Sequence, residues 1–215
     1  MNLKRRLYEH NDHQPLEFVN DIGEAIIRVE EEYCEWAYNN PNYNQKTERV
    51  FAYELYHQFK MLTVCDTKYR NLRLDGEIDK RVTQPIELCG LVIENFTQVR
   101  FSPDLVIHLG QTDRQDENQK AIIELKTKRL YGKQGQLEIK KTILKLNHYL
   151  RVLHFQYAIF LSVNTEFNNL TEQLNNLFEN PANQDWQERF SRIIVMNYKS
   201  RILSVKTLKD ILMNG

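Results

Sequence analysis

The sequence lacks several features that would assign it to a class of proteins at once. Its three cysteines, Cys34, Cys65 and Cys89, are irregularly spaced and form no CxxC pair, so they indicate buried thiols in a reducing compartment rather than a zinc or thioredoxin-like site. No run approaches the ~18 apolar residues of a membrane helix. The basic opening MNLKRRLYEHNDHQ also lacks the apolar segment of a signal peptide. We therefore expect a soluble, cytoplasmic protein with no membrane partner.

An excess of charge of either sign is also missing. Lysine plus arginine and aspartate plus glutamate both total 29 residues, so the formal net charge is zero at pH 7. The chain has no overall positive field to attract nucleic acid, and any such binding must come from a local group of basic residues. Apolar residues make up 41% of the sequence, which is enough to bury the core of one domain.

Hydrophobic periodicity predicts an α/β fold. Apolar residues spaced by three and four predict helices, and alternating or continuous apolar runs predict strands. Helices are expected at Pro15–Tyr38, Gln45–Leu62, Gln136–Val152, Leu170–Phe178 and Leu208–Met213, with a turn at Asn39–Asn44. Strands are expected at Leu72–Ile78, Val99–Leu109, Lys120–Thr127, Tyr157–Val163 and Arg192–Tyr198. The polar stretch Gly110–Gln119 has turn composition and joins its two neighbouring strands into an antiparallel hairpin, while Pro85–Asn95 fits either a strand or a loop.

Two of these strands carry charged residues within apolar runs, and such departures from patterning tend to mark functional sites. Asp104 follows Pro103 in the first strand, and Glu124 and Lys126 lie in the second. Residues two apart on a strand point to the same face, so Glu124 and Lys126 project together, and strand pairing brings Asp104 beside them. Two carboxylates suit Mg²⁺, which completes its shell with water and substrate phosphate. The sequence therefore predicts metal-assisted hydrolysis of a phosphate ester, with Lys126 holding or activating the water.

The motifs Ser102-Pro103-Asp104 and Ile123-Glu124-Leu125-Lys126 together resemble the signature of the PD-(D/E)xK nucleases, the superfamily of type II restriction endonucleases. The resemblance covers roughly residues 48–163 and implies a restriction endonuclease-like core, αβββαβ, with a mixed central sheet flanked by helices. It implies that Asp104, Glu124 and the Leu125 backbone carbonyl bind Mg²⁺, for which Mn²⁺ could substitute, and that Lys126 positions the water. Residues 1–215 would then form one domain, with an N-terminal helical extension at about 15–38 and a C-terminal helix-strand-helix extension at about 165–215.

Many members of this superfamily add a glutamate from the first core helix. Glu48 and Glu54, both within TERVFAYELYHQF, are the two candidates here, and periodicity does not separate them. Glu48 is followed by arginine, which resembles the glutamate-arginine pair of the junction resolvases. Lys145 and Tyr149 have the spacing of the Gln-x-x-x-Tyr motif of the exonuclease branch, with lysine in place of glutamine.

Basic residues near the proposed site are candidates for contact with a phosphate backbone, although a solvated helix face is the other interpretation. They are Lys128, Arg129, Lys133, Lys140, Lys141 and Lys145. The resemblance implies a nuclease whose partner is nucleic acid, with DNA expected, and a homodimer is compatible with the sequence. Two alternatives stay open. One is an inactive domain of this fold that binds nucleic acid or a protein, and the other is a structural protein in which Glu124 and Lys126 form an exposed ion pair.

Overall fold

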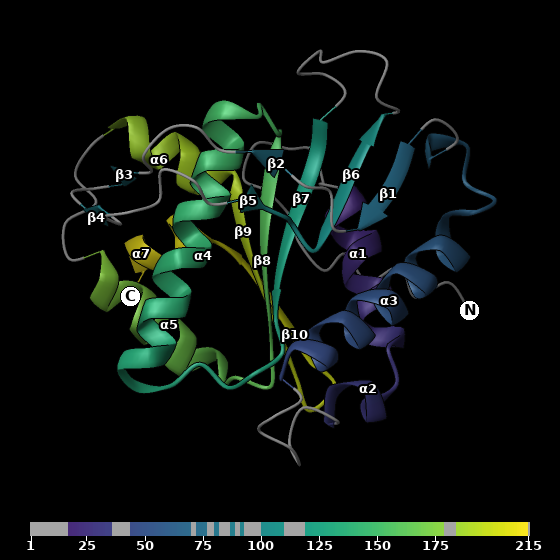
Figure 1. Ribbon diagram of the computed structural model, residues 1–215, viewed down its shortest axis with the longest axis horizontal. Helices are drawn as coiled ribbons and strands as arrows, with labels where there is room; N and C mark the ends of the chain where they lie inside the picture. Colours follow the sequence, from purple (N-terminus) through teal and green to yellow (C-terminus); the bar gives the residue numbers. More distant parts are fainter. Residues whose placement is uncertain are drawn as a thin grey trace.

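The centre of the structure is a six-stranded mixed β-sheet with helices on both faces (Figure 1). This computed structural model describes residues 17–35, 44–69, 72–76, 80–81, 87–88, 91–92, 100–109, 119–178 and 184–214. In spatial order the sheet contains β1 (Leu72–Gly76), β6 (Leu105–Leu109), β7 (Gln119–Lys126), β8 (Tyr157–Val163), β9 (Ile193–Lys199) and β10 (Ile202–Thr207). Outside it, β2 (Lys80–Arg81) pairs with β5 (Arg100–Phe101), and β3 (Glu87–Leu88) pairs with β4 (Leu91–Val92).

The sheet contains both antiparallel and parallel strand pairs. β1, β6 and β7 are antiparallel neighbours, β7, β8 and β9 run parallel, and β10 returns antiparallel to β9. Parallel strands need crossover connections, which are α4 (Gly132–Val152) between β7 and β8, and α5 (Phe167–Leu177) with α6 (Gln184–Ser191) between β8 and β9. The long elements α3 (Asn44–Thr63), β1, β6, β7, α4 and β8 follow one another in the predicted order. The predicted α/β class with a mixed, helix-flanked sheet is therefore confirmed.

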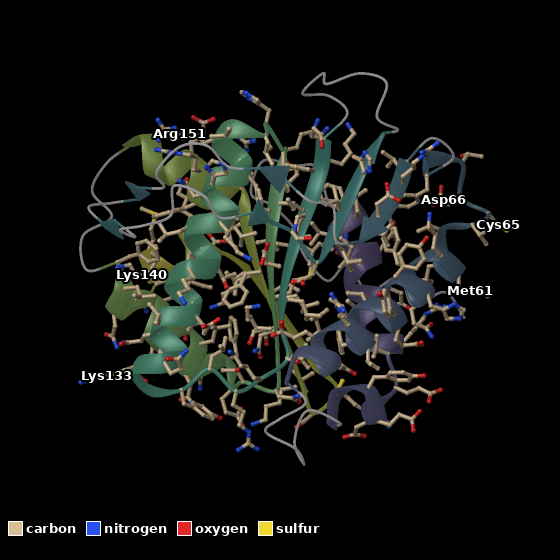
Figure 2. The ribbon with its side chains drawn as sticks, viewed as in Figure 1. Met61, Cys65, Asp66, Lys133, Lys140 and Arg151 are labelled. Atoms are coloured by element: carbon tan, nitrogen blue, oxygen red, sulfur yellow. The ribbon has the colours of Figure 1, made fainter. Side chains whose placement is uncertain are left out.

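Side-chain alternation along β7 separates two buried layers. Ile123 and Leu125 belong to the core that includes α1 (Glu17–Arg28), α2 (Glu31–Glu35) and α3. Ile122 belongs to the core that includes α4, α5, α6 and α7 (Leu208–Asn214). Side chains fill the space between the sheet and the helices on both sides (Figure 2). As a result α3 and α4, which carry the other candidate site residues, approach β7 from opposite faces.

The predicted single helix at Pro15–Tyr38 is wrong, because α1 and α2 stand in its place. At their junction the Val29 N–H donates to the Ile26 carbonyl at 3.1 Å, a bond of the tighter i→i−3 type that ends α1. Glu31 and Glu32 then occupy the first turn of α2, where negative charge favours the start of a helix. The apolar spacing continues across the junction, so periodicity alone does not reveal it.

The chain after β8 contains more elements than the helix, strand and helix predicted there, because α6 and β10 are additional. β9 and β10 form a hairpin whose two turn residues, Ser200 and Arg201, have φ values of 50° and 62°. Two-residue hairpin turns with positive φ are usually marked by Asn-Gly or Asp-Gly. Since Ser-Arg gives no such signal, the last strand of the sheet is missed from sequence.

Three further predictions involve residues beyond those described. The turns predicted at Asn39–Asn44 and Gly110–Gln119 fall almost wholly outside the described residues. The interval Pro85–Asn95 contains the short strands β3 and β4 where it is described. None of the helices in the described ranges is long and apolar enough to cross a membrane.

The connection between β7 and α4 is crowded at Gly135, where an added Cβ would lie 2.5 Å from the backbone carbonyl carbon of Leu130. Leu130 is itself held, since its N–H donates to Thr165 and its carbonyl accepts from Gln173. We expect Gly135→Ala to lower the Tm by the equivalent of about 1–3 kcal/mol, although alanine is the better helix former by ~1 kcal/mol. Thermal denaturation should show this, with Gln134→Ala, an exposed neighbour, nearly unchanged. A Tm unchanged by Gly135→Ala would contradict the close approach.

Candidate active site

Asp104 lies where the predicted strand Val99–Leu109 is interrupted. That strand is not continuous, because β5 and β6 are separated by three residues that include Pro103 and Asp104. Pro103 has no N–H and cannot donate to a strand ladder. Instead the Asp104 carboxylate continues the pairing, since its Oδ2 accepts the N–H of Leu125 at 2.6 Å, beyond the last register pair of β6 and β7. The aspartate therefore contacts Leu125, the residue between the two other predicted catalytic residues, Glu124 and Lys126.

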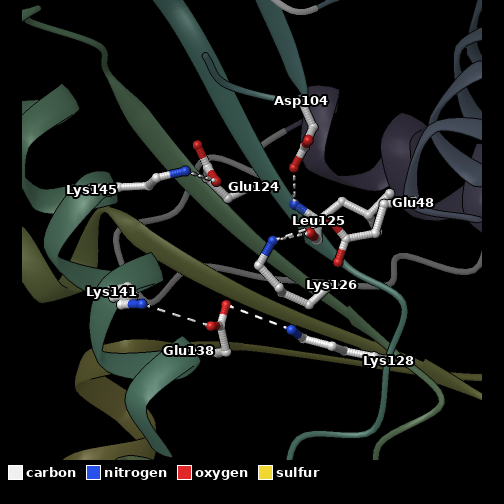
Figure 3. Close-up of polar contacts among 9 residues, drawn as sticks. All are labelled: Glu48, Asp104, Glu124, Leu125, Lys126, Lys128, Glu138, Lys141 and Lys145. Carbon is white, nitrogen blue, oxygen red and sulfur yellow. Dashed lines mark hydrogen bonds and ion pairs between the residues drawn. The ribbon is translucent and has the colours of Figure 1, made fainter. Parts of the chain in front are cut away.

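Glu124 is buried on the face of β7 that α4 covers, with 1% of its surface exposed. Both of its oxygens have partners from α4: Lys145 Nζ donates to Oε2 at 3.0 Å and the Tyr149 hydroxyl donates to Oε1 at 3.0 Å. Residues four apart on a helix share a face, so Lys145 and Tyr149 reach the same carboxylate. Figure 3 shows the contact of Lys145 with Glu124. The alternative of an exposed ion pair between Glu124 and Lys126 is wrong, because Glu124 is buried and pairs with Lys145.

Lys126, the last residue of β7, makes its contacts away from α4. Its Nζ donates to the Leu125 carbonyl at 3.0 Å and to Glu48 Oε2 at 3.4 Å (Figure 3). Both side chains are mostly buried, with 14% of Lys126 and 23% of Glu48 exposed. Glu48 comes from the first turns of α3, so the two faces of the sheet contribute to one cluster.

Of the two glutamates predicted from α3, Glu48 is the one at the site. Its carboxylate contacts the Lys126 ammonium, and its pKa is raised by burial and, to a smaller extent, by the charge of Asp104. Glu54 points toward α2 instead. Its Oε1 accepts a hydrogen bond from Gln58 at 2.6 Å, and its charge is the largest cause of the raised pKa of Tyr33.

The cluster contains more negative than positive charge around Lys126. Burial raises the pKa of both Glu48 and Glu124, and the charge of Asp104 raises both further, although nearby lysines offset part of the effect. For Lys126 burial acts to lower the pKa, but Glu48, Asp104 and Glu124 together raise it above its ordinary value. Lys126 is therefore held in its charged form. Ionisation of Glu48 and Glu124 remains unfavourable, and a further cation nearby would make it more favourable.

Asp104, Glu124 and the Leu125 carbonyl form a donor set of the kind that Mg²⁺ uses, because this ion binds through one or two carboxylates and keeps several waters. Their mutual repulsion, seen in the effect of Asp104 on Glu124, supports the fit. Within the described ranges, no three His, Cys, Asp or Glu side chains are grouped as a metal site. Water and substrate oxygens would therefore have to complete the shell of an ion held here.

Three of the six basic residues predicted to bind nucleic acid lie around the site. Lys145 contacts Glu124, as described above. Lys128 and Lys141 both approach Glu138, with Nζ–oxygen distances of 3.8 and 3.9 Å, on the side of α4 that faces the end of β7 (Figure 3).

The other three basic residues lie farther out. Arg129 and Lys133 are exposed, and Lys140 is half-buried. Figure 2 shows Lys133 and Lys140 on the outer side of α4, away from the sheet. The structure therefore does not bring all six into one patch.

Two polar contacts of buried side chains in the sheet were not predicted from sequence. Tyr149 holds Glu124, and only its spacing from Lys145 gave a signal. His108 of β6 forms a hydrogen bond with Asp75 of β1 (Nε2–Oδ2 2.7 Å) and is 4% exposed. A histidine inside the apolar run Leu105–Leu109 is the sequence signal for this second contact.

Asp104→Asn tests the electrostatic cost directly. In chelator we expect a raised Tm, by the equivalent of about 1 kcal/mol, because the amide keeps an acceptor for the Leu125 N–H but removes one repelling charge. The pKa values of Glu48 and Glu124 are raised, so their ionisation costs stability only as the pH rises through those raised values. The gain should thus be larger near pH 7 than near pH 4.5, as measured by thermal denaturation.

Two comparisons sharpen this experiment. Asp75→Asn removes a carboxylate from the adjacent strand and should give no gain, because Asp75 has His108 as a partner. Added Mg²⁺ should stabilise the wild type more than Asp104→Asn, because the stabilisation by a ligand grows with the logarithm of its affinity for the folded state. A lowered Tm for Asp104→Asn in chelator would contradict the proposed repulsion.

No protein-family model matches this chain, and no curated protein or solved structure matches it either. The likeness to the PD-(D/E)xK nucleases therefore stays a prediction, carried by Asp104, Glu124 and Lys126. The structure adds the proximity of these residues to Glu48 and to two donors from α4. A buried, charge-rich cluster at the end of β7 is the feature that any account of function has to explain.

Proposed function

We propose that this chain is a Mg²⁺-dependent nuclease, which hydrolyses phosphodiester bonds by attack of water. The observation that carries the proposal is the environment of Lys126. The Lys126 side chain is 14% exposed, and its ammonium contacts Glu48 and the Leu125 carbonyl and lies in the field of the Asp104 and Glu124 charges. Burial of several charges in one place is costly and needs a compensating role. A phosphate-hydrolysing site supplies that role, because it requires both metal ligands and a fixed cation.

The ion would be held by Asp104, Glu124 and the Leu125 carbonyl. When bound, Mg²⁺ supplies positive charge that polarises a phosphoryl oxygen and makes a nearby water more acidic. The protein's contribution is to orient the ligands before the ion arrives. The Leu125 N–H holds Asp104, and Tyr149 holds Glu124, so neither carboxylate has to be ordered during binding.

Glu48 and Lys126 take different parts in the attack of water. The raised pKa of Lys126 keeps its ammonium charged, so it orients the water and stabilises the negative charge that develops on the phosphate. Burial and the charge of Asp104 raise the pKa of Glu48, so its carboxylate is a stronger base than an ordinary glutamate and takes the proton of the attacking water. Their contact at 3.4 Å places the base next to the group that orients the water.

DNA is the substrate we propose, and the local basic residues provide the electrostatic attraction. Lys128 and Lys141 lie on the same side of α4 as the cluster, where a phosphate backbone would pass. A second candidate function is binding of nucleic acid without cleavage. The simultaneous presence of Asp104, Glu124 and Lys126 in one buried cluster favours catalysis.

Lys126→Met is the variant that tests this proposal. With Mg²⁺ we expect the wild type to cleave one or more members of a panel of linear, circular and branched DNA with matching RNA. Lys126→Met should lower the rate by at least ~10²-fold, because the ammonium acts mainly on charge that develops in the transition state. Calorimetric titration should show Mg²⁺ binding retained, since the ligands remain.

The control is Lys120→Met, at the other end of β7 and outside the cluster, which should keep the wild-type rate. Cleavage by the wild type in excess chelator, or full activity of Lys126→Met, would overturn the proposed site. Binding of the panel without any cleavage would instead support the second candidate function.

A further inference from the structure

Glu124 is held by two donors of different kinds, and only one of them is able to leave. Tyr149 is fully buried, and burial together with the charges of Glu124 and Asp104 raises its pKa, so it stays a neutral donor to Oε1. The Lys145 side chain is 25% exposed and reaches Oε2 from the edge of α4. A long lysine stem can move its ammonium between neighbouring acceptors while its backbone stays fixed.

Lys145 is the positive charge that neutralises Glu124 in the structure. The Glu124 side chain is only 2% exposed, so water cannot replace this partner. Lys126, the other ammonium of the cluster, donates instead to Glu48 and the Leu125 carbonyl. Removal of Lys145 would therefore leave a buried carboxylate without an ion-pair partner.

A divalent ion at Glu124 and an ammonium at the same carboxylate compete, because like charges repel and the same negative charge serves both. Nucleic acid changes the balance, because it brings phosphate groups that accept from an ammonium. With an ion at Glu124 and a phosphate nearby, Lys145 has a new partner within reach of its stem. Without nucleic acid, the ion has to displace Lys145 from Glu124 with no phosphate to accept from its ammonium.

We propose that Lys145 is an exchangeable counter-ion of Glu124, which occupies this carboxylate in the free protein and transfers to substrate phosphate when metal and nucleic acid bind together. This inference rests on the proposed nuclease function and adds regulation to it. It implies that Mg²⁺ binds weakly to the free protein and that nucleic acid strengthens its binding. Because such coupling is reciprocal, Mg²⁺ strengthens binding of nucleic acid by the same factor.

The experiment measures Mg²⁺ affinity by calorimetry, and affinity for a short DNA duplex with and without Mg²⁺. All proteins carry Lys126→Met to slow turnover, so activity is not the readout. We expect Lys145→Met to bind Mg²⁺ about tenfold more tightly than its parent in the absence of DNA, because the competing charge is gone. The gain in duplex affinity on addition of Mg²⁺ should fall several-fold.

Three companion variants separate charge from structure. Lys145→Arg keeps the charge and should behave like the parent. Lys145→Gln keeps a hydrogen-bond donor without charge, and should follow Lys145→Met even if the methionine variant is unstable. Lys120→Met removes a lysine at the other end of β7, outside the cluster, and should leave Mg²⁺ affinity nearly unchanged.

The two proposals fail in different ways. Mg²⁺ affinity that is unchanged or weaker in both Lys145→Met and Lys145→Gln, with the parent still binding Mg²⁺ and duplex, would overturn the counter-ion role alone. A parent protein that binds no Mg²⁺ with or without duplex would overturn both the counter-ion role and the proposed function.

Discussion

The hydrogen bond from the Leu125 N–H to Asp104 is the contact on which the geometry of the cluster depends. A side chain, rather than a backbone carbonyl, accepts the Leu125 N–H where the register of β6 and β7 ends. The residue held in this way stands between Glu124 and Lys126. On one side of it Glu124 contacts α4, and on the other the Lys126 ammonium contacts the Leu125 carbonyl and Glu48 of α3.

The helices that pack on opposite faces of the sheet supply the hydrogen-bonding and charged partners of Glu124 and Lys126. α4 supplies Lys145 and Tyr149 to Glu124, and α3 supplies Glu48 to Lys126. Burial, with a smaller contribution from the charge of Asp104, still raises the pKa of both Glu48 and Glu124, although these lysines act to lower it. A fold selected only for stability would gain by replacing such groups with apolar ones of similar volume. The free-energy cost of burying these charged groups together is expected of a site that binds a cation for catalysis.

Local patterning in the sequence predicts the sheet strands with strong apolar runs, the helices α3 and α4, and the meeting of Asp104 with the Glu124 strand. The failures arise where the deciding contact is not local or carries no typical residue. The Ser200-Arg201 turn lacks the glycine that marks a tight hairpin. The choice between Glu48 and Glu54 depends on how α3 lies against β7, and the periodicity of one helix cannot supply that.

The two ammonium groups of the cluster also depend on contacts that local sequence patterning does not predict. They are suited to different roles. The sequence predicts that Lys126 positions a water and that Lys145 contacts a phosphate backbone, but it does not show which carboxylate each ammonium contacts. In the structure Lys126 is more buried and three carboxylates raise its pKa, whereas Lys145 is more exposed and contacts Glu124. A cation surrounded by several fixed charges has little to gain from a new partner, so it is suited to hold a position throughout a reaction. A cation that contacts a carboxylate at the edge of a buried site gains another acceptor when a phosphate arrives, and is suited to exchange.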